Sequence, residues 1–201
     1  IMRSRNQSLN EARRQAILDA ATECFVRRGF HASSMKDIST EAGMSPGTVY
    51  HYFASKADIV AGIIDRENEA TAALLAALGA HENVLAGLFA VLDRIAGQVT
   101  ERDLVLHAEV ASEVLRQAPL HERARRNDEA TCEALAERLR LAQSAGQLPV
   151  ELDSRSAAVA IGTMIDGLLW RATLHGPGVI AAELPALRHA FVRLLAKDED
   201  R

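Results

Sequence analysis

Apolar residues recur every three or four positions along most of the chain, which is the spacing of one face of an α-helix. Between these periodic stretches stand glycines, prolines and polar residues that can start or stop a helix. The pattern predicts nine helices, near residues 9–28, 35–42, 46–52, 56–79, 82–99, 102–117, 119–145, 154–175 and 179–197. Few glycines and prolines and many alanines and leucines favour the same conclusion. We therefore expect an all-α fold.

The two shortest predicted helices are joined by a tight turn. Ser34 followed by Asp37 is typical of a capping box that starts a helix. Gly43 can enter the left-handed backbone region at little cost, which ends that helix and starts the turn. Ser45 can cap the next helix, and Pro46 fits its first turn, where a backbone N–H has no helical partner. A helix, a glycine turn and a second short helix form a helix-turn-helix.

A wider set of residues gives this motif a specific context. The set is Ile17, Ala20, Ala21, Phe25, Gly29, Phe30, Ile38, Ala42, Gly43, Ser45, Gly47, Thr48, Val49, Tyr50, Tyr52, Phe53, Ser55 and Lys56. In order and spacing these residues resemble the N-terminal head of a TetR-family transcriptional regulator. The resemblance implies a three-helix, helix-turn-helix DNA-binding domain at residues 1–55. It also implies a C-terminal helical ligand-binding and dimerisation domain at residues 56–201.

Charge is distributed unevenly between the two parts. Residues 1–60 contain eight Lys and Arg against six Asp and Glu, whereas the remainder contains fifteen against twenty-one. A mildly basic head on an acidic body suits a DNA-contacting domain joined to one that does not touch DNA. Arg3 and Arg5, in an expected loose arm at residues 1–8, could reach a phosphate or the minor groove. A disordered tail is the alternative.

In a helix-turn-helix the second helix enters the major groove, and its N-terminal residues contact base edges. Gly47 would allow close approach of the backbone, Thr48 offers a hydroxyl and a methyl group, and His51 can reach base edges. Hydroxyl and ammonium groups would bind phosphates, with Lys56 assisted by free N–H groups at a helix start. By resemblance, DNA contacts are expected at Ser34, Lys36, Ser45, Pro46, Gly47, Thr48, Tyr50, His51, Tyr52 and Lys56. The alternatives are packing roles for the two tyrosines and a solvated Lys56.

The predicted helix near 154–175 is apolar on nearly every side. Between residues 157 and 174 only Asp166 and Arg171 are charged. A helix of this kind is buried all round, and a chain of this size can cover one face with its own core. We expect the other face to meet a second copy, together with the helix near 179–197. A central helix in a monomeric bundle is the alternative.

The resemblance also implies a small-molecule pocket between the fourth and eighth helices. Phe89, His107, Met164 and Trp170 are the first candidates to line it. Each could instead be a core residue, and Trp170 could belong to the dimer contact. Glu109 and Glu113, one helical turn apart, could meet a cationic ligand or a metal, or could lie on a solvated helix face.

These features favour a sequence-specific, homodimeric transcriptional regulator, a repressor released from a pseudo-palindromic DNA operator by a small-molecule effector. An effector-independent architectural or division-linked DNA-binding protein would share the same head. A small helical enzyme is the least favoured class, because no catalytic, phosphate-loop or metal-ligand motif is present. We expect no catalytic residue, cofactor or metal. Reduced thiols at Cys24 and Cys132 and no apolar run approaching the length of a membrane span favour the cytoplasm.

Overall fold

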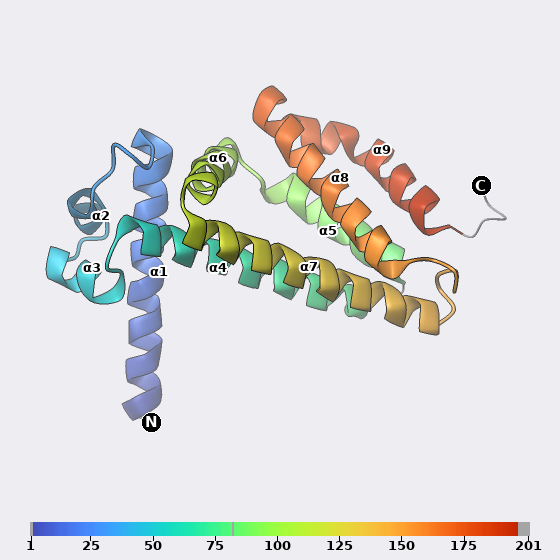
Figure 1. Ribbon diagram of the computed structural model, residues 1–201, viewed down its shortest axis with the longest axis horizontal. Coiled ribbons are helices and arrows are strands. Elements are labelled where there is room, and N and C mark those ends of the chain that lie inside the picture. The colour runs from blue at the N-terminus through green and yellow to red at the C-terminus, as the bar shows by residue number, and fades with distance from the viewer. Residues whose placement is uncertain (1, 82, 197–201) are drawn as a thin grey trace. The chain divides into compact units, whose positions relative to one another are not determined.

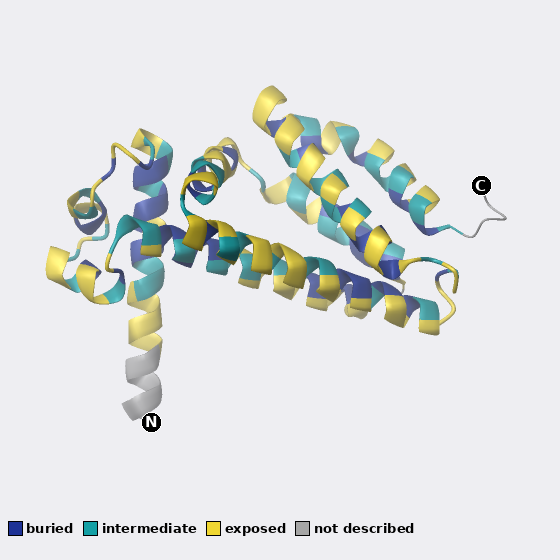
Figure 2. Cartoon of the chain, in the orientation of Figure 1, coloured by how far each residue is buried: buried dark blue, intermediate teal, exposed yellow. Residues whose placement is uncertain are grey.

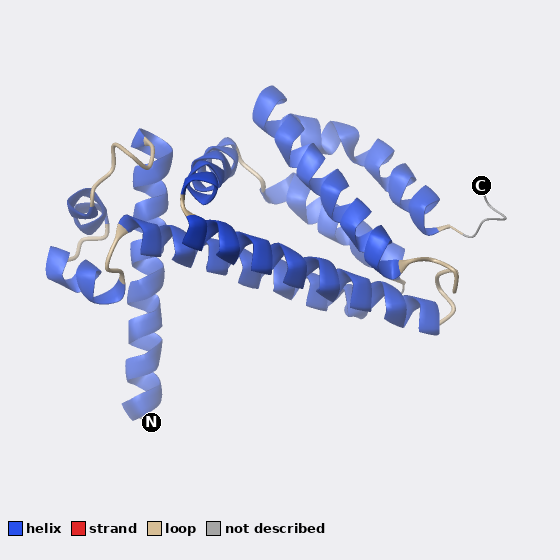
Figure 3. Ribbon diagram, in the orientation of Figure 1, coloured by secondary structure: helices blue, strands red, loops and turns tan. Residues whose placement is uncertain are grey.

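The computed structural model describes the backbone of residues 2–81 and 83–196, and the side chains of residues 8–81 and 83–196. Within these ranges every regular element is a helix (Figures 1 and 3). In chain order the elements are α1 (Met2–Arg28), α2 (Met35–Glu41), α3 (Pro46–Tyr52), α4 (Lys56–Ala77), the 3-10 helix η1 (Leu78–Ala80), α5 (Val84–Gln98), α6 (Glu101–Arg116), α7 (Ala118–Ser144), α8 (Ser154–His175) and α9 (Gly178–Leu195). The predicted all-α fold is confirmed.

Helix α1 is the one element whose bounds differ widely from the prediction. It begins at Met2 rather than near residue 9, so the expected loose arm was wrong for residues 2–8. No glycine or proline interrupts residues 2–28, and the helix continues past the capping signal at Ser8. The side chains of Arg3 and Arg5 lie outside the described residues. All other helix ends lie within two residues of their predicted positions.

The chain divides into two compact units. The first comprises residues 1–66 and 105–124, and the second comprises residues 67–104 and 125–201. Helices α4, α6 and α7 each contribute residues to both units. Packing therefore groups most of α6 with the helix-turn-helix. The boundary predicted between residues 55 and 56 stays a prediction about functional domains.

The core of the first unit is formed by apolar side chains from the segment α1 to α4 and from α6 and α7. Ile38, Val49 and Phe53 of the helix-turn-helix are all buried in it. Figure 2 shows buried residues in dark blue along the C-terminal half of α1. Gly62 allows α4 to pack closely, because a Cβ at this position would lie 2.9 Å from Leu18 Cδ2 and 3.0 Å from Phe53 Cε1. The residue that follows α3, Phe53, and Leu18 of α1 are thus both in close contact with α4. The buried residues of the first unit's core are Ile17, Leu18, Ala20, Ala21, Cys24, Phe25, Phe30, Ile38, Val49, Phe53, Ile59, Val60, Ile63, Ile64, Leu106, Val110 and Leu120.

The second unit is built around α8, which packs along α9 (Figure 1). Ile161 of α8 and Phe191 of α9 are fully buried in its core. By length and composition α8 could cross a membrane, so the expectation that no apolar run approaches that length was wrong. A core helix of a soluble protein passes the same test, which makes the signal weak. Only 28% of the apolar window of α8 is buried inside this chain, so much apolar surface remains uncovered.

Candidate nucleic-acid interface

Helix α3 is short, firmly capped and exposed along one face. The Ser45 hydroxyl oxygen accepts a hydrogen bond from the Thr48 N–H at 3.1 Å, and Pro46 occupies the first turn. Val49 alone of the seven residues is buried. Gly47 is open to solvent, and the Tyr50 side chain is 53% exposed. The helix therefore presents a free surface that is anchored from beneath.

The Ser45 and Thr48 side chains also bond to each other, with 2.9 Å between their hydroxyl oxygens. A hydroxyl has one proton, so one of the two donates to the other and one O–H remains available. The pair can thus donate one hydrogen bond to a phosphate. Both residues stand at the N-terminal end of α3, beside exposed Gly47.

Ser34 and Asp37 form the predicted capping box at the start of α2. The Ser34 hydroxyl donates to Asp37 Oδ2 at 2.6 Å and accepts from the Asp37 N–H at 3.1 Å. The Ser34 hydroxyl and backbone N–H hold the pKa of Asp37 below its ordinary value of 3.8. Lys36, in the first turn of α2, is exposed, and its ammonium has no hydrogen-bond partner among the described residues. Lys36 is therefore the freer of the two predicted phosphate ligands.

Tyr52 is half-buried and tied to α1. Its hydroxyl donates to Asn10 Oδ1 at 3.1 Å, and the His51 ring meets its ring edge-on with 5.3 Å between centroids. This contact fixes the end of α3 against α1 and orients His51. His51 itself is exposed.

Lys56, the first residue of α4, has internal partners that the sequence did not indicate. Its ammonium donates to the backbone carbonyls of Phe30 and Ser33, each at 2.5 Å, and lies 4.2 Å from the centroid of the Phe30 ring. Burial lowers the pKa of the Lys56 ammonium from its ordinary 10.5, while the charges of Glu113 and Asp37 oppose that shift. This environment favours a positioning role. A phosphate contact by Lys56 stays a prediction.

Two acidic residues of α6, Glu109 and Glu113, belong to the same compact unit as α3. The Glu113 side chain is buried, and Glu109 is half-buried. They share one face of α6 with the core residues Leu106 and Val110, at helical spacings of three and four. This shared face is the sequence signal that could have indicated that the two glutamates point toward the core. It does not reveal which residues they contact there. The expected solvated face is wrong for Glu113, and the described residues contain no cluster suited to a metal.

The four predicted ligand-pocket residues lie in different surroundings. Phe89 and Met164 are half-buried against the core of the second unit, and the Arg188 guanidinium lies 5.3 Å from the centroid of the Phe89 ring. His107 is exposed, and Trp170 is 63% exposed. Their assignment to an effector pocket stays a prediction.

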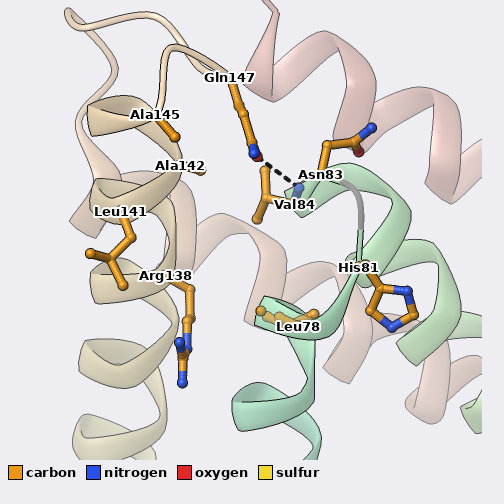
Figure 4. A pocket seen from close by; sticks show the side chains of 10 residues that line it. Leu78, His81, Asn83, Val84, Arg138, Leu141, Ala142, Ala145 and Gln147 are labelled. Carbon is orange, nitrogen blue, oxygen red and sulfur yellow. Dashed lines mark hydrogen bonds between the residues drawn. The ribbon is translucent and has the colours of Figure 1, made fainter.

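Hollows in the second unit include a cavity beside η1 and a groove along α8 and α9. A cavity of about 160 Å³ lies between η1, the start of α5 and the end of α7, lined by Leu78, Gly79, His81, Asn83, Val84, Arg138, Leu141, Ala142, Ala145 and Gln147. Figure 4 shows Gln147 reaching across it, where the amide oxygen accepts a 3.1 Å hydrogen bond from the Val84 N–H. A shallow groove of about 340 Å³ lies between α8 and α9, and Met164 lines it with Gly167, Leu168, Arg171, Glu183, Ala186, Leu187 and Ala190.

Comparison with known proteins places the chain in a family. Residues 17–63 match the bacterial regulatory proteins of the tetR family, and residues 80–197, more than half of the chain, match the C-terminal region of BetI-type transcriptional repressors. The regulator TtgR of Pseudomonas putida is 30% identical over 187 residues, which span 85% of this chain and 84% of TtgR. The chain belongs to the TetR family.

Two further proteins resemble this TetR-family protein, one over a short segment and the other at lower sequence identity. The Escherichia coli regulator UidR is 46% identical over 56 residues, which span 28% of this chain and 29% of UidR. The match to UidR therefore covers less than a third of that protein. The structure of SmeT in complex with triclosan shares the fold, with a TM-score of 0.72, 22% identity and coverage of 93% of each chain.

Proposed function

We propose that this TetR-family protein is a homodimeric repressor that binds a pseudo-palindromic DNA operator and is released by a small-molecule effector. The exposed face of α3 is the observation that carries the proposal. A seven-residue helix capped by Ser45 presents Gly47, Tyr50 and His51 to solvent above a buried helix-turn-helix core. The setting for this function is the cytoplasm, where bacterial operator DNA lies.

In the proposed complex, the N-terminal end of α3 enters the major groove. Gly47 lets the backbone approach the bases, Thr48 presents its methyl to thymine, and His51 reaches base edges deeper in the groove. The hydroxyls of Ser45 and Tyr50 bind phosphates beside α3, and the ammonium of Lys36 does so from α2. Tyr52 and Lys56 act mainly through their bonds to Asn10 and to the Phe30 and Ser33 carbonyls.

The second copy of the chain would cover the apolar surface of α8 and α9. Trp170 is 63% exposed and Leu174 62% exposed, both on α8, and Val192 on α9 is also exposed. Exposed large apolar side chains along a pair of packed helices are typical of a protein contact. The groove between the helices is edged by the ion pair between Arg171 and Glu183, which gives the contact a polar rim.

The proposed effector site lies in the helical region that follows the head. SmeT, which shares the fold, was solved with triclosan bound. A ligand that binds better to the form unable to reach both half-sites lowers operator affinity by that difference in binding. The second candidate, an effector-independent DNA-binding protein, predicts the same head and no such response.

Selection of binding sites from random duplex DNA, repeated with a panel of metabolites, tests the proposal. We expect enrichment of a two-fold related site whose half-sites are about 34 Å apart, roughly one turn of the double helix. The variant His51→Ala should change the selected bases, whereas His121→Ala, an exposed residue of α7 outside the proposed dimer contact, should not. Failure of the wild-type protein to enrich any sequence would rule out the proposed function.

A further inference from the structure

The turn between α1 and α2, residues 29–33, is held from one side by α6. We refer to these five residues as the α1–α2 corner. Oε2 of Glu109 accepts a hydrogen bond from the Phe30 N–H at 2.8 Å. The carboxylate also lies against Gly29, because a Cβ built there would be 3.5 Å from Glu109 Oε1. Gly29 has a positive φ of 81°, which ends α1 and turns the chain toward this carboxylate.

The same corner is held from another side by α4. The Lys56 ammonium donates to the carbonyls of Phe30 and Ser33. Phe30 thus has its N–H bound by an anion and its C=O bound by a cation. Hydrogen bonds to charged groups are the stronger class in proteins, and these two are partly shielded from water. The Phe30 ring is buried in the core beneath them.

Glu113 lies one helical turn beyond Glu109 and is 2% exposed. Its Oε2 accepts a 2.7 Å hydrogen bond from Gln117, and its Oε1 lies 3.2 Å from Nε2 of His31. Arg116 also approaches that His31 nitrogen, at 2.8 Å. A buried carboxylate is expensive unless it is paired and hydrogen-bonded. Two acidic side chains on one face of α6 therefore meet the corner, and one of them is buried there.

We propose that Glu109 and Glu113 are positioning residues for DNA reading. The corner leads directly into Ser34, which caps α2, and α2 leads through the glycine turn into α3. The position of α6 therefore sets the position of the corner and, through it, the pose of α2 and α3. This inference rests on the proposed DNA-binding function and adds the contact through which α6 controls it.

Other polar ties between α1 and α2 cannot substitute for this contact. Arg27 pairs with Glu41 at 2.6 Å, and Arg28 pairs with Asp37 at 3.1 Å, but the side chains of both pairs are substantially exposed. Exposed ion pairs contribute little and are screened by salt. Neither pair involves α6. The contacts of α6 with the head are thus the polar contacts of Glu109, Glu113 and Arg116 and the apolar contacts of Leu106, Val110 and Val114.

The test compares Glu109→Ala with Glu101→Ala, an exposed acidic residue in the first turn of the same helix. Both changes remove one negative charge, so their general electrostatic effects on DNA binding are similar. If the corner without Glu109 occupies the reading pose about one-tenth of the time, the Kd for the selected operator rises about tenfold. Binding to unrelated DNA and the slope of log Kd against log salt should match the control, because no phosphate ligand is removed. The conservative change Glu109→Gln keeps an acceptor oxygen for the Phe30 N–H but loses the charge, so its operator affinity should lie between those of Glu109→Ala and the Glu101→Ala control.

A purely structural role for Glu109 predicts a different result. The melting temperature would fall while the folded Glu109→Ala protein bound the operator within about twofold of the Glu101→Ala control, and that outcome overturns the inference. If Glu109→Ala does not fold, the test compares the operator affinities of Glu109→Gln and Glu113→Gln with that of the control Glu101→Gln. Both variants should bind the operator more weakly than the control. Equality of both variants with that control also overturns the inference. Absence of operator binding by the wild-type protein is a separate failure, because it removes the proposed function itself.

Discussion

Asp65 of α4 and Arg123 of α7 form an ion pair in which a single nitrogen, Nη1 of Arg123, donates to both carboxylate oxygens of Asp65, at 2.7 Å to Oδ1 and 2.8 Å to Oδ2. Both residues belong to the first compact unit, so the pair joins the start of α7 to α4 within it. Lysine keeps the charge but has no planar guanidinium. Because both side chains are partly exposed, Arg123→Lys should lower the free energy of unfolding by only about 0.5 kcal/mol. Urea unfolding measures this change in the free energy of unfolding, and Arg13→Lys on the exposed surface of α1 is the control.

Two glycines of α5 should respond to alanine in opposite directions. A Cβ at Gly87 would lie 3.1 Å from the backbone oxygen of Leu78, and backbone cannot move aside cheaply. Gly97 has nothing within 4 Å. Gly87→Ala should therefore destabilise the protein by about 1–3 kcal/mol through overpacking. Gly97→Ala should stabilise it by up to about 1 kcal/mol through helix propensity, and thermal unfolding distinguishes the two signs.

The capping box of α2 predicts a specific acid sensitivity. Because Ser34 holds the pKa of Asp37 below 3.8, ionised Asp37 stabilises the folded state above that pH. This contribution is lost as the pH falls through the depressed pKa of the folded state. The free energy of unfolding should therefore fall less steeply with acid in Asp37→Asn than in the wild type below about pH 4. Parallel pH profiles for the two proteins would contradict the assigned role of Asp37.

Self-association should depend on the exposed apolar face of α8. Leu174→Glu places a charge among apolar side chains of the proposed contact and should raise the dimer dissociation constant by about 100-fold, or about 2.7 kcal/mol. Val150→Glu is the control, because Val150 is more exposed than Leu174 but lies in the loop before α8. Analytical ultracentrifugation measures both. Equal dissociation constants for the two variants would remove α8 from the dimer contact.

Two lysines of the head should differ in how they affect DNA binding. Lys36→Ala should weaken binding on all sequences and reduce the salt slope by about one, because its free ammonium suits a phosphate. Lys56→Ala should lower affinity for the selected operator and leave the salt slope unchanged, because its ammonium binds the Phe30 and Ser33 carbonyls. Fluorescence anisotropy over a salt series tests this. A reduced slope for Lys56→Ala would instead support the phosphate contact expected from the sequence.

Local signals in the sequence were sufficient for most of the fold. The reciprocal bonds of Ser34 and Asp37, the positive φ of Gly43 and the cap by Ser45 depend on residues only a few positions apart. The spacing of residues was therefore enough to place α2 and α3 to within a residue. The early start of α1 was missed because a cap at Ser8 competes with uninterrupted helix propensity over residues 2–28, and propensity prevailed.

Contacts between residues far apart in the chain could not be predicted from one sequence. The bond between Phe30 and Glu109 joins residues 79 positions apart, and that between Lys56 and Phe30 joins residues 26 positions apart. Side-chain type alone suggested a solvated glutamate and a phosphate-binding lysine. The exposure of His107 was likewise hidden, because apolar periodicity does not reveal the surroundings of one polar residue, whereas the exposure of Trp170 agrees with the dimer contact given as an alternative for it.

The short length of α3 limits how much information one head can read. Seven residues rising about 1.5 Å each span about 10 Å, or roughly three base pairs at 3.4 Å per step. Two heads reading six base pairs would distinguish about one sequence in 4,000, whereas a genome offers about 10⁶ or more competing positions. Base contacts from α3 alone would therefore leave hundreds of equivalent sites. The count of six bases already assumes one fixed spacing between the half-sites, so the remaining discrimination must come from beyond the bases opposite α3, for example from the shape and stiffness of the DNA between the half-sites.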